Sequence, residues 1–249
     1  MVFIKTRSEI DKIRDAGKIV GEVLARMADE VRPGVSTLEL DSLAESIITS
    51  YPDARPAFKG YGGFPNALCT SVNDEVVHGI PKRARVIGDG DLVSIDVGVY
   101  FKGYYGDAAA TFFAGEPEEP QKKLIETTRA ALVAGIGKAA AGNRLGDIGA
   151  AVQRVAEEAG FSVVRDLVGH GIGQNLHEDP PVPNYGTPGR GYLLQEGLVL
   201  AIEPMVNEGG YEVETLQDNW TVVTKDGKLS AHFEHTVAVG ANGSEILTI

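Results

Sequence analysis

One arrangement occurs twice in this chain and limits the folds open to it. A long helical pattern, a glycine and a shorter helical pattern come first, and a stretch rich in predicted strands follows. The first helix is predicted over about 7–31, since apolar positions recur three and four apart, at Ile10, Ile13, Gly17, Val20, Leu24, Met27 and Val31. The other helices are predicted over about 37–49, 122–141 and 145–159, and the strand-rich stretches over about 64–113 and 161–249.

Capping residues and glycines punctuate these helices. Thr6 with Glu9 and Ser36 with Glu39 have the spacing of capping boxes at the first two helix starts. Glycines 34 and 142 hold the same place in the two arrangements, 108 positions apart. The pattern predicts an α+β fold with a central antiparallel sheet and helices on one face. We expect one domain over 1–249, with similar halves at about 1–115 and 116–249; a chance likeness of two helical hairpins is the alternative.

Charge and composition exclude several classes of protein. The 35 acidic residues outnumber the 23 Lys and Arg, and a net charge of −12 disfavours sequence-specific binding of nucleic acid. Uninterrupted apolar runs such as 130–134 reach five residues, against about 20 for a membrane span. The first ten residues lack the apolar core of a secretory signal. A single cysteine leaves no intramolecular disulfide and fits a reducing, cytoplasmic location.

Two aspartates stand in the first pair of predicted strands. Residues 92–100 alternate between apolar and small or polar side chains, and Asp96 lies on the polar face. Asp107 shares a face with Ala109 and Thr111 in the next predicted strand. The connection between the two strands is short enough for a hairpin. We therefore expect the two carboxylates side by side on a face of small residues.

Two glutamates stand in strands of the second half. Glu203 closes the apolar run 198–202, which is typical of a strand buried on both faces, and Glu234 stands at the head of a predicted strand over 232–239. Clustered buried carboxylates need a compensating positive charge, yet these segments contain no Lys or Arg. We infer divalent metal ions. The alternative is that the acids are surface charge on edge strands.

A histidine among glycines adds a nitrogen donor. Glycines 169, 171 and 173 around His170 allow close approach of the backbone. Four carboxylates and one imidazole can hold two divalent ions about 3.5–4 Å apart, and a mostly oxygen shell favours Mn, Fe or Co. Two further histidines, His78 and His177, lie in other loops, where a packed or hydrogen-bonding role is the alternative to a catalytic one.

The same residues resemble a known family. Segments 67–73 (ALCTSVN), 77–81 (VHGIP), 169–173 (GHGIG), 202–207 (IEPMVN) and 233–236 (FEHT), together with Asp96 and Asp107, resemble the type I methionine aminopeptidases. The resemblance spans about residues 5–248. It implies the pita-bread fold, with two pseudo-symmetric αβ halves around an antiparallel sheet in one catalytic domain. It also implies removal of the N-terminal methionine from nascent proteins, by a hydroxide that two metal ions activate.

The resemblance also implies a role for each metal ligand. Asp96 would be the bidentate ligand of one divalent ion. Asp107 and Glu234 would bridge both ions, and His170 and Glu203 would complete the other site. Glu203 would in addition handle the proton of the reaction. The ions would be Co, Mn, Fe or Zn.

The other implied residues surround the substrate. His177 would donate to the developing oxyanion, and His78 would hydrogen-bond the scissile amide nitrogen. The resemblance implies a methionine pocket formed by Tyr61, Phe64, Cys69, His78 and Trp220, and a monovalent cation near Asn73, Glu75 and Ser230. This sequence departs from some relatives at Phe58, Phe64 and Leu176.

Three alternatives are disfavoured. A prolidase-like peptidase would carry a sizeable N-terminal domain, whereas the first helix is expected from about residue 7. A type II methionine aminopeptidase would carry an insertion, whereas 25 residues separate His177 from Glu203. A non-catalytic binding protein of the same fold would tend to lose metal ligands, and all five are present here. We expect a monomer that acts on peptides and nascent chains with N-terminal methionine, with a transient ribosome contact and no membrane association.

Overall fold

The computed structural model describes residues 2–249. Its helices are α1 (Arg7–Glu30), α2 (Thr37–Ser50), the 3-10 turn η1 (Tyr61–Gly63), α3 (Glu119–Ile136) and α4 (Leu145–Glu158). Its strands are β1 (Arg55–Pro56), β2 (Leu68–Val72), β3 (Glu75–Val77), β4 (Leu92–Phe101), β5 (Tyr104–Phe113), β6 (Ser162–Val163), β7 (Gly169–Gly171), β8 (Glu178–Val182), β9 (Val199–Ile202), β10 (Met205–Asn207), β11 (Val213–Thr215), β12 (Val222–Thr224), β13 (Ser230–His232), β14 (His235–Val239) and β15 (Ser244–Ile246).

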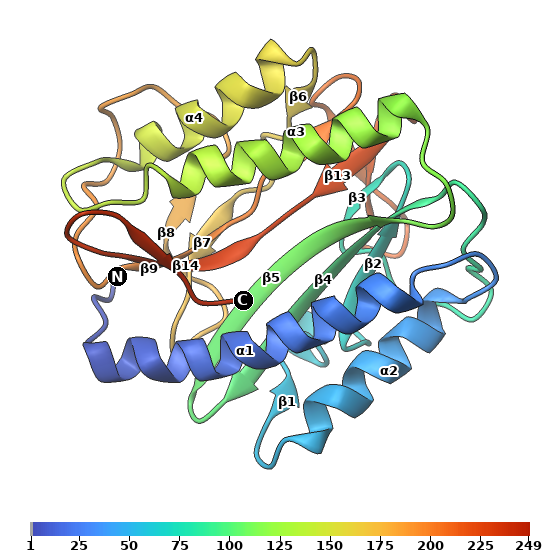
Figure 1. Ribbon diagram of the computed structural model, residues 1–249, viewed down its shortest axis with the longest axis horizontal. Coiled ribbons are helices and arrows are strands. Elements are labelled where there is room, and N and C mark those ends of the chain that lie inside the picture. The colour runs from blue at the N-terminus through green and yellow to red at the C-terminus, as the bar shows by residue number, and fades with distance from the viewer. Residues whose placement is uncertain (1) are drawn as a thin grey trace.

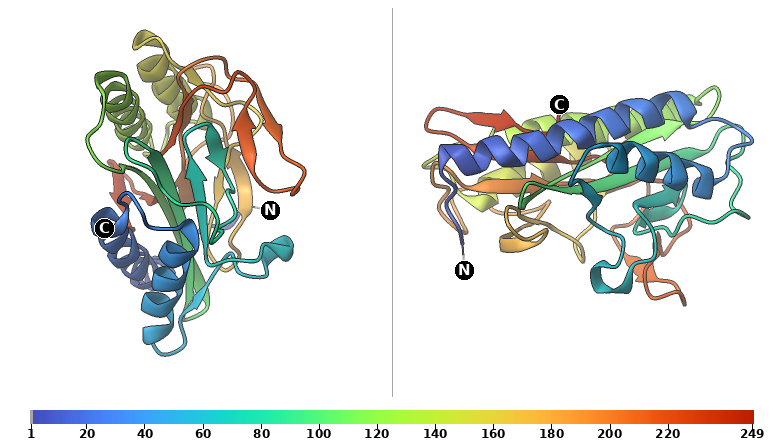
Figure 2. Two further views of the ribbon diagram at one scale, coloured as in Figure 1. Left: turned by 90° about the vertical axis from the view of Figure 1, so that its right-hand side faces the viewer. Right: turned by 90° about the horizontal axis from the view of Figure 1, so that it is seen from below.

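The four helices lie together on one face of the strands (Figures 1 and 2). Every pairing between named strands is antiparallel within residues 2–249. The expected α+β fold with antiparallel sheets is confirmed. One buried core lies beneath α1 and α2 against β4, and another lies beneath α3 and α4 against β9. None of the helices within 2–249 is long and apolar enough to cross a bilayer.

The first helices begin where their capping residues predict. In both predicted capping boxes the hydroxyl of Thr6 or Ser36 accepts the N–H three residues on, and the glutamate side chain accepts the N–H of the cap residue. The two corresponding glycines also share a left-handed backbone, with φ of 90° at Gly34 and 93° at Gly142. Such a conformation favours glycine, which has no Cβ to clash.

The predicted limits of the third helix were wrong. The helix begins at Glu119 because proline is tolerated in a first turn, where its missing N–H has no partner to lose. It ends at Ile136, five residues before the predicted end, because the segment after the helix hydrogen-bonds to the hairpin of β14 and β15. There the N–H of Ala141 donates to the carbonyl of Gly240 at 3.0 Å.

The predicted hairpin is confirmed as β4 and β5. The predicted strand over 232–239 is instead split into β13 and β14, because the backbone of Glu234 bonds β5. The Glu234 N–H donates to the Ala109 carbonyl at 2.9 Å. Beside it, the Thr236 hydroxyl donates to the Asp107 carbonyl at 2.8 Å and accepts the Asp107 N–H at 3.0 Å. These bonds join the two strand systems and bring Glu234 close to Asp107, where β5 and β14 run side by side in Figure 1.

Candidate metal centre

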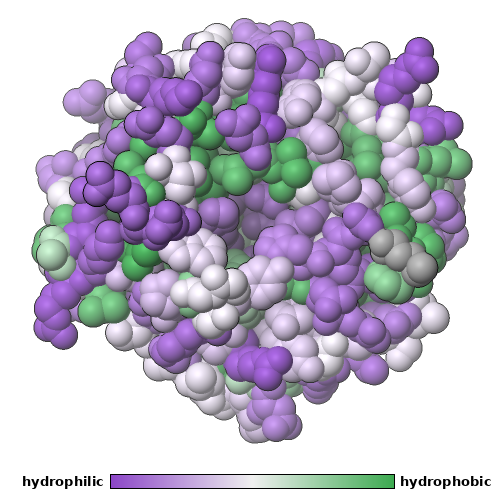
Figure 3. Space-filling model, turned by 180° about the vertical axis from the view of Figure 1, so that it is seen from behind, coloured by the Kyte–Doolittle hydropathy of each residue, from purple (hydrophilic) through white to green (hydrophobic). Residues whose placement is uncertain are grey.

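A cavity of about 180 Å³ opens on the face away from the helices, which is hollowed near its centre in Figure 3. All eleven candidate site residues line it: Tyr61, Phe64, Cys69, His78, Asp96, Asp107, His170, His177, Glu203, Trp220 and Glu234. The remaining lining residues are Phe58, Gly62 and Leu176. The structure therefore brings together in one cavity all the residues proposed as divalent-metal ligands, catalytic groups and methionine pocket, from both halves of the chain.

Four carboxylates converge at one end of this cavity. Asp107 and Glu234 are buried, and Asp96 and Glu203 are partly buried where they face the cavity. Asp96 Oδ1, Asp107 Oδ1 and Glu234 Oε1 have no hydrogen-bond partner among residues 2–249. Within the same residues no Lys or Arg forms an ion pair with any of the four acids. Buried, unpaired carboxylates of this kind require a cation or a proton.

The pKa values of the four acids also indicate that the cluster requires a cation or a proton. Burial raises the pKa of Glu203 to about 8 and that of Asp96 to about 7. The pKa values of Asp107 and Glu234 are raised well above the usual range, by burial first and then by the neighbouring carboxylates. A divalent cation would reverse this by favouring the ionised form of every ligand.

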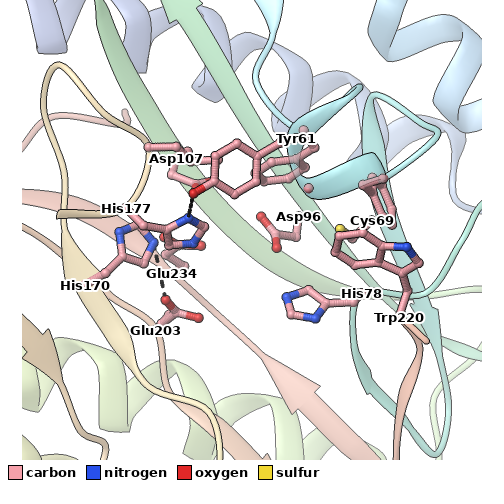
Figure 4. A pocket seen from close by; sticks show the side chains of 14 residues that line it. Tyr61, Cys69, His78, Asp96, Asp107, His170, His177, Glu203, Trp220 and Glu234 are labelled. Atoms are coloured by element: carbon pink, nitrogen blue, oxygen red, sulfur yellow. Dashed lines mark hydrogen bonds and ion pairs between the residues drawn. The ribbon is translucent and has the colours of Figure 1, made fainter. Parts of the chain in front are cut away.

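The glycines beside His170 are explained by close backbone contacts. A Cβ at position 169 would lie 2.3 Å from the carbonyl oxygen of Ala201, and one at 171 would lie 2.2 Å from that of Asp179. His170 Nδ1 lies 2.9 Å from the Gly171 carbonyl oxygen, which can only accept, so Nδ1 carries the proton. The lone pair on Nε2 is then directed to the cluster, 3.6 Å from Glu203 Oε1 (Figure 4). This is the orientation of a metal-binding imidazole.

Aromatic side chains line the other end of the cavity (Figure 4). Phe64 and Trp220 meet edge to face with ring centroids 5.2 Å apart, and Trp220 meets His78 in the same way at 6.4 Å. Cys69 is buried and lies opposite Asp96 in the β2–β4 register. At the mouth, His177 Nδ1 lies 2.8 Å from the Tyr61 hydroxyl. The acidic cluster thus adjoins an apolar, aromatic compartment.

The donor set fits divalent metal ions. In each of two groups of residues, the donor atoms all lie within 4.8 Å of one another. One group is Asp107, His170 and Glu234, and the other is Glu203, His232 and Glu234. The first contains three of the ligands implied by the sequence resemblance. The second adds His232, which sequence reasoning missed. The alternation of a strand could have found His232, because positions 232 and 234 fall on one face.

The residues expected around a monovalent cation also lie near one another. The N–H of Ser230 donates to the carbonyl of Asn73 at 2.9 Å. Glu75 accepts the N–H of Val72 on its side chain and lies in β3, next to β12. Whether a cation binds at this place stays a prediction.

Comparison with known proteins assigns the chain to a class. A buried cluster of carboxylates and histidines without a compensating Lys or Arg is a candidate site of a metal-dependent enzyme. The model of metallopeptidase family M24 matches residues 11–241, and the chain belongs to this family.

Several of the similar proteins are methionine aminopeptidases. That of Clostridium acetobutylicum is 55% identical over 100% of this chain and 99% of the relative, and that of Bacillus subtilis is 50% identical with the same coverage. The crystal structure of the Thermotoga maritima methionine aminopeptidase aligns with a TM-score of 0.97 and 49% identity, covering 100% of this chain and 99% of the other. A prolidase from Pyrococcus horikoshii aligns with a TM-score of 0.80 and 25% identity, and this chain covers 63% of it. The sequence resemblance to methionine aminopeptidases and the pita-bread fold are confirmed.

Proposed function

We propose that this protein is a metal-dependent aminopeptidase that removes the N-terminal methionine from peptides and nascent proteins. The main observation behind the proposal is the cavity, in which a cluster of acids without an ion pair to Lys or Arg adjoins an aromatic compartment. The full-length likeness to methionine aminopeptidases supports the same conclusion. A prolidase-like activity is less favoured, because the prolidase aligns with a lower TM-score and a lower identity than the methionine aminopeptidases.

Two divalent ions would be held by five side chains. Asp96 would bind one ion, His170 and Glu203 would bind the other, and Asp107 and Glu234 would bridge them. The unpartnered oxygens of Asp96, Asp107 and Glu234 support this assignment. When bound, the ions would lower the pKa of a water molecule and so supply a nucleophile near neutral pH. Mn, Fe and Co suit the oxygen-rich donor set, and Zn is the further candidate.

Glu203 and the two cavity histidines would assist the reaction. Glu203 lines the cavity, where its carboxylate can accept a proton and deliver it to the leaving amine. If the Tyr61 hydroxyl donates to His177 Nδ1, then Nε2 carries a proton that it can donate to the oxygen of the scissile carbonyl. His78 faces the cavity and would hydrogen-bond the scissile amide nitrogen. Burial lowers the pKa of His78 to about 4, so this imidazole is neutral at pH 7.

The aromatic compartment would receive the methionine side chain. Phe64 and Trp220 form apolar walls, and Cys69 lies beside them with Tyr61 at the mouth. A thioether packs favourably against aromatic rings and polarisable neighbours. The specificity for methionine would then come from the shape of this compartment.

Several further properties are proposals of the same kind. We propose that the chain forms one catalytic domain whose halves, at about 1–115 and 116–249, are pseudo-symmetric. The matching glycines 34 and 142 support this division. A monomeric state, a cytoplasmic location, a transient ribosome contact and a monovalent cation near Asn73, Glu75 and Ser230 stay predictions.

Peptide cleavage with metal add-back tests the function. Protein treated with EDTA is given Mn, Co, Fe or Zn ions separately, and amino-acid release is measured from peptides that begin with Met, Leu or Pro and from an Ala-Pro dipeptide. We expect no release without metal and release from the Met peptide with at least one ion. Preferential cleavage of Ala-Pro, or full activity in verified metal-free protein, would contradict the proposal.

A further inference from the structure

His232 is a buried histidine to which neither the sequence resemblance nor the proposed reaction gives a role. It ends β13, and 1% of its surface is exposed. Its backbone is fixed from β5, because the Thr111 hydroxyl donates to the His232 carbonyl at 2.8 Å and accepts the His232 N–H at 2.9 Å. The Ser94 hydroxyl lies 2.8 Å from the same Thr111 oxygen. The imidazole therefore projects from a rigid part of the sheet.

The Nε2 atom of His232 is directed at the metal centre. It is buried and has no hydrogen-bond partner among residues 2–249. It lies 3.6 Å from Glu203 Oε2. A buried, unpartnered donor costs about 1–3 kcal/mol, so a histidine in such a position calls for an explanation.

The two oxygens of Glu203 face two different imidazoles. Oε1 lies 3.6 Å from His170 Nε2, which carries a lone pair because Nδ1 donates to a carbonyl. Two acceptors cannot bond each other, so a cation belongs between them. Oε2 faces His232 Nε2, which is free to carry a proton. One side of the carboxylate is therefore suited to a metal ion and the other to a hydrogen-bond donor.

We propose that His232 is a positioning residue for Glu203: its Nε2–H donates to Oε2 and holds Oε1 toward the metal ions. The inference rests on the proposed function, in which Glu203 is a metal ligand. The present 3.6 Å separation exceeds a charge-assisted hydrogen bond of about 2.7–2.9 Å by less than 1 Å. Because the backbone of His232 is fixed, the gap would be closed by a side-chain rotation of Glu203.

Metal binding separates this role from a structural one. Calorimetric titration of metal-free protein with Mn²⁺ measures affinity without reference to peptidase activity. Loss of an outer hydrogen bond to a ligand typically weakens metal binding about 10–100-fold, and we expect this loss for His232→Leu. His232→Gln keeps an N–H donor of similar reach and should bind Mn²⁺ within about threefold of wild type. Its Co²⁺-loaded form should keep the wild-type absorption spectrum, because no ligand has changed.

A matched control comes from the neighbouring histidine. His235 bonds Thr248 through Nδ1 and belongs to neither of the two groups of candidate metal-binding donor atoms, so His235→Gln should leave Mn²⁺ affinity unchanged. If His232→Leu does not fold, as judged by circular dichroism, His232→Ala replaces it.

Two results would overturn the inference. Wild-type Mn²⁺ affinity in the apolar variant would remove any positioning role. Affinity in His232→Gln as weak as in His232→Leu, with an altered Co²⁺ spectrum, would make His232 a metal ligand instead of a donor to Glu203. Wild-type protein that binds no divalent ion at all would overturn the proposed function on which the inference rests.

Discussion

Asp96 and Asp107 are diagonal neighbours across the β4–β5 hairpin, since Asp96 lies opposite Ala109 and Asp107 lies opposite Gly98. The small partners leave room for both carboxylates on one face of the sheet. Gly98 is also required by the cavity wall, because a Cβ there would lie 2.7 Å from Cε1 of Phe58. One hairpin therefore supplies two acids of the cluster and the space for an aromatic wall beside them.

Replacement of Glu203 by Gln should abolish methionine release while the fold persists. The amide has nearly the same shape but cannot accept the proton, and general acid–base catalysis contributes about 10²–10⁴-fold to rate. The metal-free variant should be at least as stable as wild type, because a buried carboxylate is removed from a cluster of like charges. Release of methionine from a Met-Ala-Ser peptide and thermal unfolding measure the two effects.

An exposed glutamate provides the control for this substitution. Glu196→Gln changes the net charge equally but lies on the surface, and its turnover should equal that of wild type. Near wild-type turnover of Glu203→Gln would refute the assigned proton-handling role.

The stability of the metal-free protein should fall as pH rises from 6.5 to 8. The folded-state pKa values of Asp96, about 7, and Glu203, about 8, lie above the unfolded value near 4. Between the unfolded and folded values, the folded protein therefore keeps protons that the unfolded chain releases. The free energy of unfolding falls as pH rises, until both acids are ionised in the folded protein as well. Burial lowers the pKa values of all five histidines, which changes stability in the opposite direction; this effect is largest below about pH 6.5 and fades as pH rises further.

Denaturant unfolding at several pH values measures this dependence. We expect the free energy of unfolding to fall by at least about 1 kcal/mol between pH 6.5 and 8, given about 1.4 kcal/mol per proton and pH unit. Saturating Mn²⁺ should remove or reverse the slope, since its ligands bind deprotonated. Constant or rising stability of the metal-free protein over this interval would show that the acids are already ionised without a metal.

The parts of the fold that were predictable are those fixed by neighbours in sequence. Capping boxes such as Thr6 with Glu9 locate helix starts, and alternation in 92–100 locates Asp96 on the correct face. The break between β13 and β14 was not predictable, because it depends on hydrogen bonds from Glu234 to Ala109, which is distant in sequence. The early end of α3 has the same kind of cause, because the segment after the helix hydrogen-bonds to the hairpin of β14 and β15, which is distant in sequence.

The site was more predictable in its residues than in its geometry. Each acid stands in or at the end of a predicted strand with small or apolar neighbours and no Lys or Arg, so the four carboxylates could be selected from sequence. The role of His232 depends on a separation of 3.6 Å from Glu203, which joins segments that the chain places far apart. The pairing of β10 with β13 and of β9 with β14 brings these segments together.

Replacement of Phe64 by Ala should weaken methionine recognition. Phe64 is buried against Trp220 at the aromatic end of the cavity. Loss of about 1.5–3 kcal/mol of apolar contact corresponds to a fall of about 10–100-fold in kcat/KM for a Met-Ala-Ser peptide. The effect should appear mainly in KM, because this contact is made equally before and during the reaction. Phe64→Tyr keeps the ring and is the control; an unchanged KM in the alanine variant would place the methionine elsewhere.

Lys5 and Glu178 form a buried ion pair that fixes the loop carrying His177. Lys5 Nζ lies 2.6 Å from Glu178 Oε2, and the two side chains are 4% and 3% exposed. The other oxygen of Glu178 accepts the N–H of Asn175 at 3.1 Å, so the pair connects the N-terminal segment to the loop before His177. Lys5→Met keeps the apolar stem but leaves a buried carboxylate without its counter-charge.

Such an uncompensated charge costs about 3–5 kcal/mol, and we expect this loss in the free energy of unfolding of Lys5→Met. Activity should also fall, because His177 is adjacent to Glu178 and depends on the same loop. The double variant Lys5→Met, Glu178→Gln removes both charges and should recover most of the stability, which a double-mutant cycle measures as a coupling energy. Equal stability of Lys5→Met and wild type would mean that water reaches Glu178, and the loop would then be held by its backbone bonds and packing alone.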